Sequence, residues 1–225
     1  MLLFSNLKKF ILEGNIYFNH IDMIHHTNNI VTNSFQYLPN YVLDLPAIIE
    51  YYENGQLYKE VWYKNGKRHR EVDLPTDIHY KNGQSSIQSW YKNDKFHRKG
   101  DSPAKIYYYH NEQPFIQTWY KNGKLHREGD LPARIYYYEN GQPFMQFWYT
   151  NDILHREGDL PVFIQYYENG QLKFEKWYKN GKRHREGNLP AEIEYYENEK
   201  LKFERWYKND KLHREGDLPD EIEFY

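Results

Sequence analysis

The chain has 225 residues, with 30 basic against 32 acidic side chains and no cysteine. This charge balance argues against a general nucleic-acid or anionic-membrane binder, which needs a basic excess, and the absence of cysteine excludes disulfides and thiolate metal sites. The apolar fraction is only 39%, yet it includes 24 tyrosines and 6 tryptophans, so we expect little aliphatic core and much amphipathic aromatic surface.

Residues 1–43 do not match the rest of the chain and are predicted to form a small N-terminal cap. Ser5 is suited to cap a short helix and Gly14 to end it, and its apolar face would carry Leu7, Phe10 and Ile11. The stretch that follows fits either a decayed repeat or an irregular strand pair.

Residues 44–225 are predicted to form one elongated array. The tryptophans recur at spacings of 28, 29, 29, 29 and 29 residues, and the histidines of a His-Arg pair keep the same spacing. Six full units and the opening strand of a seventh fill this region, which is typical of a repeat protein. The repeated tryptophans are Trp62, Trp90, Trp119, Trp148, Trp177 and Trp206.

Within one unit, two Asn-Gly turns separate three strand-like segments. In the fifth unit the segments are "VFIQYY", "QLKFEKWY" and "KRHRE", so the unit is predicted to be a β-meander. A three-residue first turn would pair Ile164 with Phe174 and Tyr166 with Leu172, whereas a two-residue turn would pair Ile164 with Glu175. The three-residue turn places apolar residues opposite one another, so we expect this turn.

The same choice gives Ile135–Met145 with Tyr137–Pro143, and also Ile193–Phe203, in other units. The second unit is one residue short, and the missing residue is predicted to come out of the turn, leaving Ile78 opposite Ile87.

The second turn, treated in the same way, sets Trp177 opposite Arg183 and Glu175 opposite Arg185. One face would then carry Ala/Val, Ile, Tyr and Phe/Ile/Met, and the other Trp and a Glu/Gln–Arg pair. Neither face is cleanly polar, and amphipathic aromatic residues lie on both. The sequence therefore predicts an all-β, single-layer antiparallel meander. Three strands a repeat at ~4.8 Å each would put equivalent residues ~14 Å apart, in an array ~85 Å long.

The tandem "YYENGQLKFEKWYKNGKRHREG" resembles the variant form of the MORN repeat over about residues 44–225. In that family Asn-Gly turns alternate with strands ending in Tyr or Trp, and the arrays build elongated β-sheets. The "HREGDLPA" insert departs from the shorter standard unit and is closer to versions common in giant DNA viruses and in antitoxin-like proteins. The resemblance implies a binding or scaffolding module and brings no catalytic motif.

The six histidines could be metal ligands or general bases, or could pack as structural residues. Ligands of one zinc ion lie about 2 Å from it, so residues ~14 Å apart cannot share an ion. Near the N-terminus, His20, His25 and His26 lack a carboxylate or cysteine at ligand spacing. Phosphate-binding loops and nucleophile motifs are missing from the sequence. We therefore predict no catalytic, metal or cofactor-binding residue, and a protein that is not an enzyme.

The aromatic residues offer a candidate partner-binding ladder, formed by the six tryptophans together with Tyr138, Tyr167 and Tyr196. Trp, Tyr and Arg dominate binding hot spots, and rows of aromatics can also stack nucleobases. The alternative is that each tryptophan covers the sheet face of its own unit. Between the functional options, the near-neutral charge favours a protein partner over nucleic acid.

The sequence thus predicts a non-enzymatic module for protein–protein interaction or scaffolding. A peripheral membrane or lipid-binding module is the alternative, but the lysines lie at turns beside acids rather than on one basic face. We expect a monomer, with acids on the terminal strand "DEIEFY" and the N-terminal cap protecting the two sheet ends. Because the first lysines follow an apolar run, the reverse of a secretory signal, we expect a cytoplasmic protein, or one of the host cytoplasm or virion if it is viral.

Overall fold

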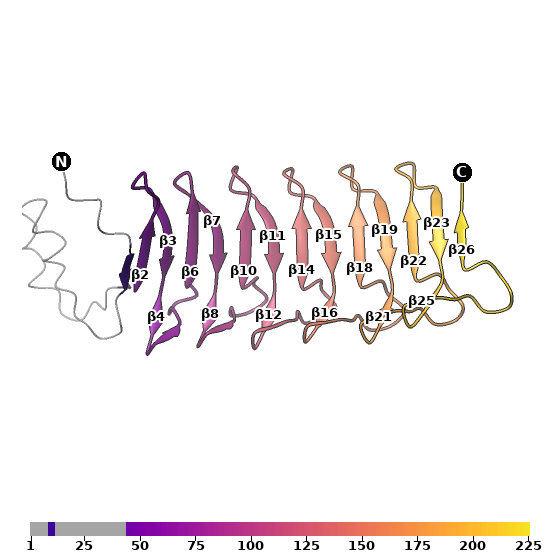
Figure 1. Ribbon diagram of the computed structural model, residues 1–225, viewed down its shortest axis with the longest axis horizontal. Coiled ribbons are helices and arrows are strands. Elements are labelled where there is room, and N and C mark those ends of the chain that lie inside the picture. Colours follow the sequence, from indigo (N-terminus) through magenta and orange to yellow (C-terminus); the bar gives the residue numbers. More distant parts are fainter. Residues whose placement is uncertain (1–8, 12–43) are drawn as a thin grey trace, which may run out of the picture.

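The computed structural model describes residues 9–11 and 44–225, and every element in these ranges is a β-strand (Figure 1). Fourteen strands form one antiparallel sheet in a single layer, and neighbours in the sheet are neighbours in sequence apart from the short hairpins between them. The predicted all-β meander is confirmed. The predicted helix is wrong where it can be seen, because β1 (Lys9–Ile11) is a strand paired with β2 (Ile48–Tyr51). The rest of the predicted cap lies outside the described residues.

The sheet takes two strands from each repeat. After β1 and β2, its strands are β3 (Leu57–Val61), β6 (Asp77–Lys81), β7 (Gln84–Ser89), β10 (Lys105–Tyr108), β11 (Pro114–Thr118), β14 (Arg134–Tyr137), β15 (Pro143–Phe147), β18 (Phe163–Tyr166), β19 (Leu172–Lys176), β22 (Glu192–Tyr195), β23 (Leu201–Arg205) and β26 (Glu221–Glu223).

The second part of each repeat forms a short hairpin that stands outside the large sheet. These hairpins follow one long edge of the sheet, and the longer turns follow the opposite edge (Figure 1). Their strands are β4 (Tyr63–Lys64) with β5 (Lys67–Arg68), β8 (Tyr91–Lys92) with β9 (Lys95–Phe96), β12 (Tyr120–Lys121) with β13 (Lys124–Leu125), β16 (Tyr149–Thr150) with β17 (Ile153–Leu154), β20 (Tyr178–Lys179) with β21 (Lys182–Arg183), and β24 (Tyr207–Lys208) with β25 (Lys211–Leu212).

Two strands per repeat, rather than three, shorten the array. Equivalent residues lie ~10 Å apart along the sheet, and fourteen strands span ~60 Å, so the predicted 14 Å step and 85 Å length are wrong.

The first turn of each unit is followed by a β-bulge that the sequence pattern did not indicate. Tyr166 pairs with Leu172 as predicted, but Lys173 is the extra residue of the bulge, and Gln165 then pairs with Phe174 and Ile164 with Glu175. The predicted Ile164–Phe174 pair is therefore wrong, since a shift of one residue moves every later side chain to the other face.

The bulge recurs in the other units. Tyr137–Pro143 is confirmed, whereas the predicted pairs Ile135–Met145, Ile193–Phe203 and Ile78–Ile87 are wrong, and Gln146, Glu204 and Gln88 take the places opposite these isoleucines. The short second unit does lose its residue from the turn, because Lys81 pairs with Gln84 across two turn residues.

The short hairpin closes through a two-residue turn, Asn180–Gly181, whose φ angles of 52° and 77° suit a tight hairpin. Tyr178 therefore pairs with Arg183, and the predicted Trp177–Arg183 pair is wrong. The predicted Glu175–Arg185 strand pair fails for the same reason.

The two faces differ from the prediction as a result. Trp, Glu/Gln, Ala/Val, Ile, the first Tyr and Leu/Pro share one face, the tryptophan face, while Phe/Ile/Met lies on the opposite one, the open face. The tryptophan face holds the core, since Ala104, Ala133, Val162 and Ala191 have no solvent-exposed surface and the tryptophan rings retain 4–6% of theirs.

Five of the six arginines of the His-Arg pairs join two repeats on the tryptophan face. The guanidinium of Arg127 lies 3.9 Å from the ring centroid of Trp119 and binds both carboxylate oxygens of Asp101, at 2.7 and 2.6 Å, in the preceding repeat. It also donates to the Pro132 carbonyl at 3.3 Å. A cation stacked on an aromatic ring and held by a two-pronged carboxylate contact fixes the offset between neighbouring repeats.

The Glu/Gln side chains, predicted to pair with these arginines, have a different partner. The Tyr137 hydroxyl donates to Gln117 Oε1 at 2.8 Å, and the Tyr195 hydroxyl donates to Glu175 Oε2 at 3.3 Å, in each case from the following repeat. Burial and the neighbouring Glu175 raise the pKa of Tyr195 to about 12, which keeps this hydroxyl protonated. Inter-repeat bonds of this kind bind the array together.

Candidate functional site: the open face

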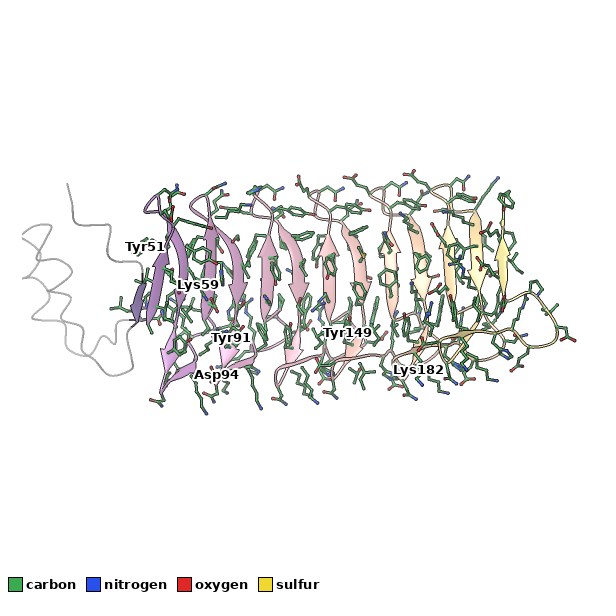
Figure 2. All side chains as sticks on the ribbon, viewed as in Figure 1. Tyr51, Lys59, Tyr91, Asp94, Tyr149 and Lys182 are labelled. Carbon is green, nitrogen blue, oxygen red and sulfur yellow. The ribbon has the colours of Figure 1, made fainter. Side chains whose placement is uncertain are left out.

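The open face lies opposite the tryptophans, and within residues 44–225 no second layer of strands or helices covers it. Its side chains come from alternate residues of the sheet strands, from the bulge residues and from the short hairpins. Most of its large side chains are half-buried rather than buried. Figure 2 shows side chains projecting along the whole length of the sheet, with Tyr91 and Tyr149 near the edge that carries the short hairpins.

The middle row of the tryptophan face has nearly the same residues in every unit. It alternates isoleucine with glutamate or glutamine across the sheet, through Ile49, Glu60, Ile78, Gln88, Ile106, Gln117, Ile135, Gln146, Ile164, Glu175, Ile193, Glu204 and Ile222. Since each repeat packs only on its neighbours, packing requires the same residue at the same place in every unit. This face builds the array.

The adjoining row of the open face varies instead. We call it the variable row, and across the sheet it runs Val61, Asp77, Ser89, Lys105, Thr118, Arg134, Phe147, Phe163, Lys176, Glu192, Arg205 and Glu221. Acids, bases, small polar residues and phenylalanines occupy one structural position. Five members are buried, namely Val61, Asp77, Ser89, Thr118 and Glu192. The other seven are half-buried, and these are the members that can meet a partner.

Aromatic rings connect the centre of the open face. Centroid separations are 5.9 Å for Tyr136–Phe147, 4.8 Å for Phe147–Phe163, 6.0 Å for Phe163–Phe174 and 5.8 Å for Phe174–Phe203. All four pairs are tilted or edge-to-face, the arrangement that aromatic rings prefer. The result is a continuous apolar strip over β14, β15, β18, β19 and β23.

The variable row also holds two buried carboxylates, one on β6 and one on β22, and each is surrounded by cations. Asp77 lies 3.7 Å from the Arg68 guanidinium and 4.0 Å from Lys59 Nζ. Glu192 lies 3.2 Å from Lys176 Nζ and 3.5 Å from the Arg183 guanidinium. Because their cations surround them, neither carboxylate is free for an external ligand.

Two cations of the variable row, between these carboxylates, have no acidic partner. Lys105 Nζ lies over Tyr107, 4.7 Å from the ring centroid, and Arg134 lies near the Tyr149 hydroxyl, whose pKa burial raises and Arg134 lowers in part. In the described part of the chain no carboxylate lies within 4.0 Å of either cation. The centre of the open face is therefore aromatic and positively charged.

The predicted ladder of tryptophans and tyrosines is not brought together. The six tryptophan rings lie on the tryptophan face, beneath arginines at 3.6–4.1 Å from their centroids. This placement agrees with the alternative that each tryptophan covers its own unit.

The ladder tyrosines lie instead near the long turns. Tyr138, Tyr167 and Tyr196 donate from their hydroxyls to backbone carbonyls of the next repeat, at 3.0, 2.9 and 3.1 Å. Tyr138 also packs on the bulge residue Phe144, with ring centroids 4.9 Å apart. These tyrosines border the open face and tie the repeats together.

The repeated histidines have contacts that structural residues would make. His126 Nε2 lies 3.2 Å from Glu128 Oε1, and its backbone N–H donates to the Trp119 carbonyl at 3.2 Å. Over the described ranges, no group of three or more His, Asp or Glu residues is arranged to hold a metal ion. His20, His25 and His26 lie outside these ranges.

The residues at the centre of the open face were missed from the sequence. Lys105, Arg134 and Phe163 occupy the same place in successive units, and comparison of the units with one another shows that this place varies. This variation can be seen in the sequence. It points to a binding surface only after the position of the bulge shows that these residues lie on the open face.

Comparison with known proteins adds no assignment. The chain matches no protein-family model, and no curated protein matches it either. In the part of the chain that the structure describes, no helix is long and apolar enough to cross a membrane.

Proposed function

We propose that the protein is a non-enzymatic repeat module that binds a protein partner through the open face. The observation that carries this proposal is the contrast between a uniform tryptophan face and a varied open face on the same strands. The uniform residues are required by packing. The variable row instead has seven half-buried members beside five buried ones, and its two phenylalanines belong to a connected aromatic strip.

The composition of the open face supports a protein partner. Tyrosine, phenylalanine and arginine supply large contact areas and are enriched at protein interfaces. The rings of the strip already contact one another, so binding would order few additional side chains. The resemblance to variant MORN repeats is in keeping with a binding or scaffolding role.

Co-purification from the native source, read by quantitative mass spectrometry, tests the proposal. The open-face variant is Tyr136→Ser with Phe174→Ser, and the control is Leu160→Ser with Leu189→Ser, two exposed leucines of the inter-repeat loops. Wild type and control should retain the same specific partner, and the open-face variant should lose it while remaining folded, as circular dichroism checks. Retention of every partner by the folded open-face variant would refute the proposal.

Flotation with anionic liposomes is the counter-test for the membrane alternative. We expect the wild-type protein to stay with the soluble fraction. Flotation that depends on Tyr136 and Phe174 would replace the protein partner by a lipid surface.

A further inference from the structure

We infer that the partner presents an acidic segment in the polyproline II conformation, lying along the array axis over Lys105, Arg134 and Phe163. This inference rests on the proposed function and adds the location, the chemistry and the spacing of the contact. It is argued from the order of residues in the variable row.

The cations of the variable row indicate that the ligand is acidic. From β10 to β18 its members are Lys105, Thr118, Arg134, Phe147 and Phe163, each the direct cross-strand neighbour of the next. The two cations have no carboxylate partner among residues 44–225, whereas the nearest cation on the far side, Lys176, is already engaged by Glu192 at 3.2 Å. The complement of this surface is a ligand with two acids followed by an apolar residue.

The sheet gives the spacing. Lys105 and Arg134 are two strands apart, as are Arg134 and Phe163, so each step is ~9.6 Å along the array. A polyproline II helix has three residues per turn and rises ~3.1 Å per residue, so side chains three positions apart share one face at ~9.3 Å. The mismatch over two steps is only ~0.6 Å.

Other backbone conformations match less well. On one face of an extended strand the side chains recur every ~6.8 Å, and those of an α-helix recur every ~5.4 Å, or ~10.8 Å after two turns. Neither spacing matches the ~9.6 Å step of the array at all three sites. Polyproline II segments also bind aromatic-lined surfaces in other recognition modules, because their backbone is ordered before binding.

The predicted ligand pattern is therefore an acid, a second acid three residues later and an apolar residue three residues after that, in either chain direction. The apolar residue would rest on Phe163, whose ring lies 4.8 Å from Phe147 and 6.0 Å from Phe174. The carboxylates Asp77, Glu192 and Glu221 on either side are already paired with cations. The positive charge without an acidic partner is therefore confined to a short stretch of this row, which suits a short acidic segment better than a long polyanion such as single-stranded nucleic acid.

Two synthetic peptides of identical composition test the spacing. Both are proline-rich; one carries glutamate at its second and fifth positions and leucine at its eighth, and the other carries the glutamates at the second and fourth positions. Binding is measured by isothermal titration calorimetry with the full chain at low and at physiological salt. We expect the first peptide to bind, at least ~tenfold more tightly than the second, and to weaken as salt rises.

Two protein variants test the site. Lys105→Glu with Arg134→Glu should weaken the first peptide by ~100-fold or more, at about tenfold per cation. Lys124→Glu with Lys182→Glu makes the same charge change on exposed hairpin residues and should leave its affinity within ~twofold of wild type, after allowance for net charge. Circular dichroism confirms that both variants are folded.

The inference is overturned if the first peptide does not bind, if the two peptides bind equally, or if the Lys105/Arg134 variant binds like wild type. Tighter binding of an oligothymidylate than of the first peptide would also overturn it, in favour of nucleic acid. Its failure is separable from that of the proposed function, since partner loss in the Tyr136/Phe174 variant would still place a protein on the open face.

Discussion

The carboxylate of Asp152 accepts a hydrogen bond from the backbone N–H of Leu125, 2.7 Å away in the preceding short hairpin. The same bond recurs in two other places, from the N–H groups of Arg68 and Arg183 to Asp94 and Asp210, each at 2.8 Å. Asp94 is labelled in Figure 2, at the hairpin edge of the sheet.

The aspartates occupy only every second hairpin turn. The other turns carry Gly66, Gly123 and Gly181, so this side-chain bond recurs only every second repeat. At Gly123 the backbone N–H still donates to the Phe96 carbonyl of the preceding hairpin, at 3.2 Å. A Cβ added at Gly123 would lie 3.4 Å from Lys95 Cβ, and one at Gly181 would lie 3.6 Å from Ile153 Cγ2. Gly123 and Gly181 thus let the preceding hairpin approach their turns closely.

Asp152 has a φ of 72°, a left-handed conformation that favours glycine. Asp152→Ala keeps the strain and loses the bond, and should lower the free energy of unfolding by ~1–2 kcal/mol. Asp152→Gly loses the bond but relieves the strain, and should change stability by less than ~0.5 kcal/mol. Urea unfolding of both variants checks this; equal destabilisation would mean that the conformation at this position is not strained.

Val72 stands where the other five units have glycine, has a φ of 63°, and leaves 85% of its surface exposed. A β-branched side chain is strained in this region of backbone space and makes few contacts there to offset the strain. We expect Val72→Gly to raise the free energy of unfolding by ~1 kcal/mol and the reverse change Gly129→Val to lower it by ~1–2 kcal/mol. Thermal unfolding of the two variants tests this expectation. A loss of stability in Val72→Gly would contradict it.

Glu175 gives a pH-dependent prediction. Burial raises the pKa of its carboxyl, against the opposing effects of the Tyr195 hydrogen bond and of Arg185. When the pKa of a carboxyl is higher in the folded than in the unfolded state, the ionised carboxylate lowers the free energy of unfolding at pH values above both pKa values. This penalty disappears at pH values below both. Other units place glutamine here, as at Gln117.

Glu175→Gln should therefore stabilise the protein at pH 7, by less than ~1 kcal/mol because the carboxyl is only partly buried. The gain should disappear as the pH falls toward ~4. Glu204→Gln makes the same change in the next repeat and serves as the comparison variant. Denaturant unfolding at both pH values measures it, and a gain that persists unchanged at low pH would point to a cause other than charge.

The histidines of the His-Arg pair are predicted to be structural. His126→Gln removes one side-chain contact, to the exposed Glu128, and leaves the backbone bond to Trp119 in place. We expect intact ligand binding and a stability change below ~1 kcal/mol, with the same result for His155→Gln and His184→Gln. An activity abolished by one of these changes and untouched by its equivalents would contradict the structural role.

The sequence predicted the architecture because the turns carry their own signals. The Asn-Gly pairs and the 29-residue spacing were sufficient for the meander, and the three-residue turn correctly placed Tyr166 opposite Leu172. The bulge at Lys173 has no such signal. Ile164 opposite Phe174 looked more favourable than Ile164 opposite Glu175 when one unit was considered alone.

The deciding contacts come from the neighbouring repeat. Glu175 is satisfied by the Tyr195 hydroxyl, and Arg185 by Asp159 at 2.8 Å, residues 20 positions later and 26 earlier. A single unit cannot show these partners, and the assignment of the two faces depends on them. The candidate site on the open face could not be found until that assignment was made.

Site-specific thiol labelling tests most directly the central claim, that one face builds the array and the other receives the partner. The chain has no cysteine, so Phe163→Cys on the open face, Ile135→Cys on the tryptophan face and Leu160→Cys in an exposed loop each provide a single thiol. Maleimide labelling rates are measured with and without the co-purified partner. The account predicts that the partner slows labelling at position 163 at least ~tenfold, that position 160 is unaffected and that position 135 is slow throughout. Unchanged labelling at position 163 with a saturating partner, or fast labelling at position 135, would contradict it.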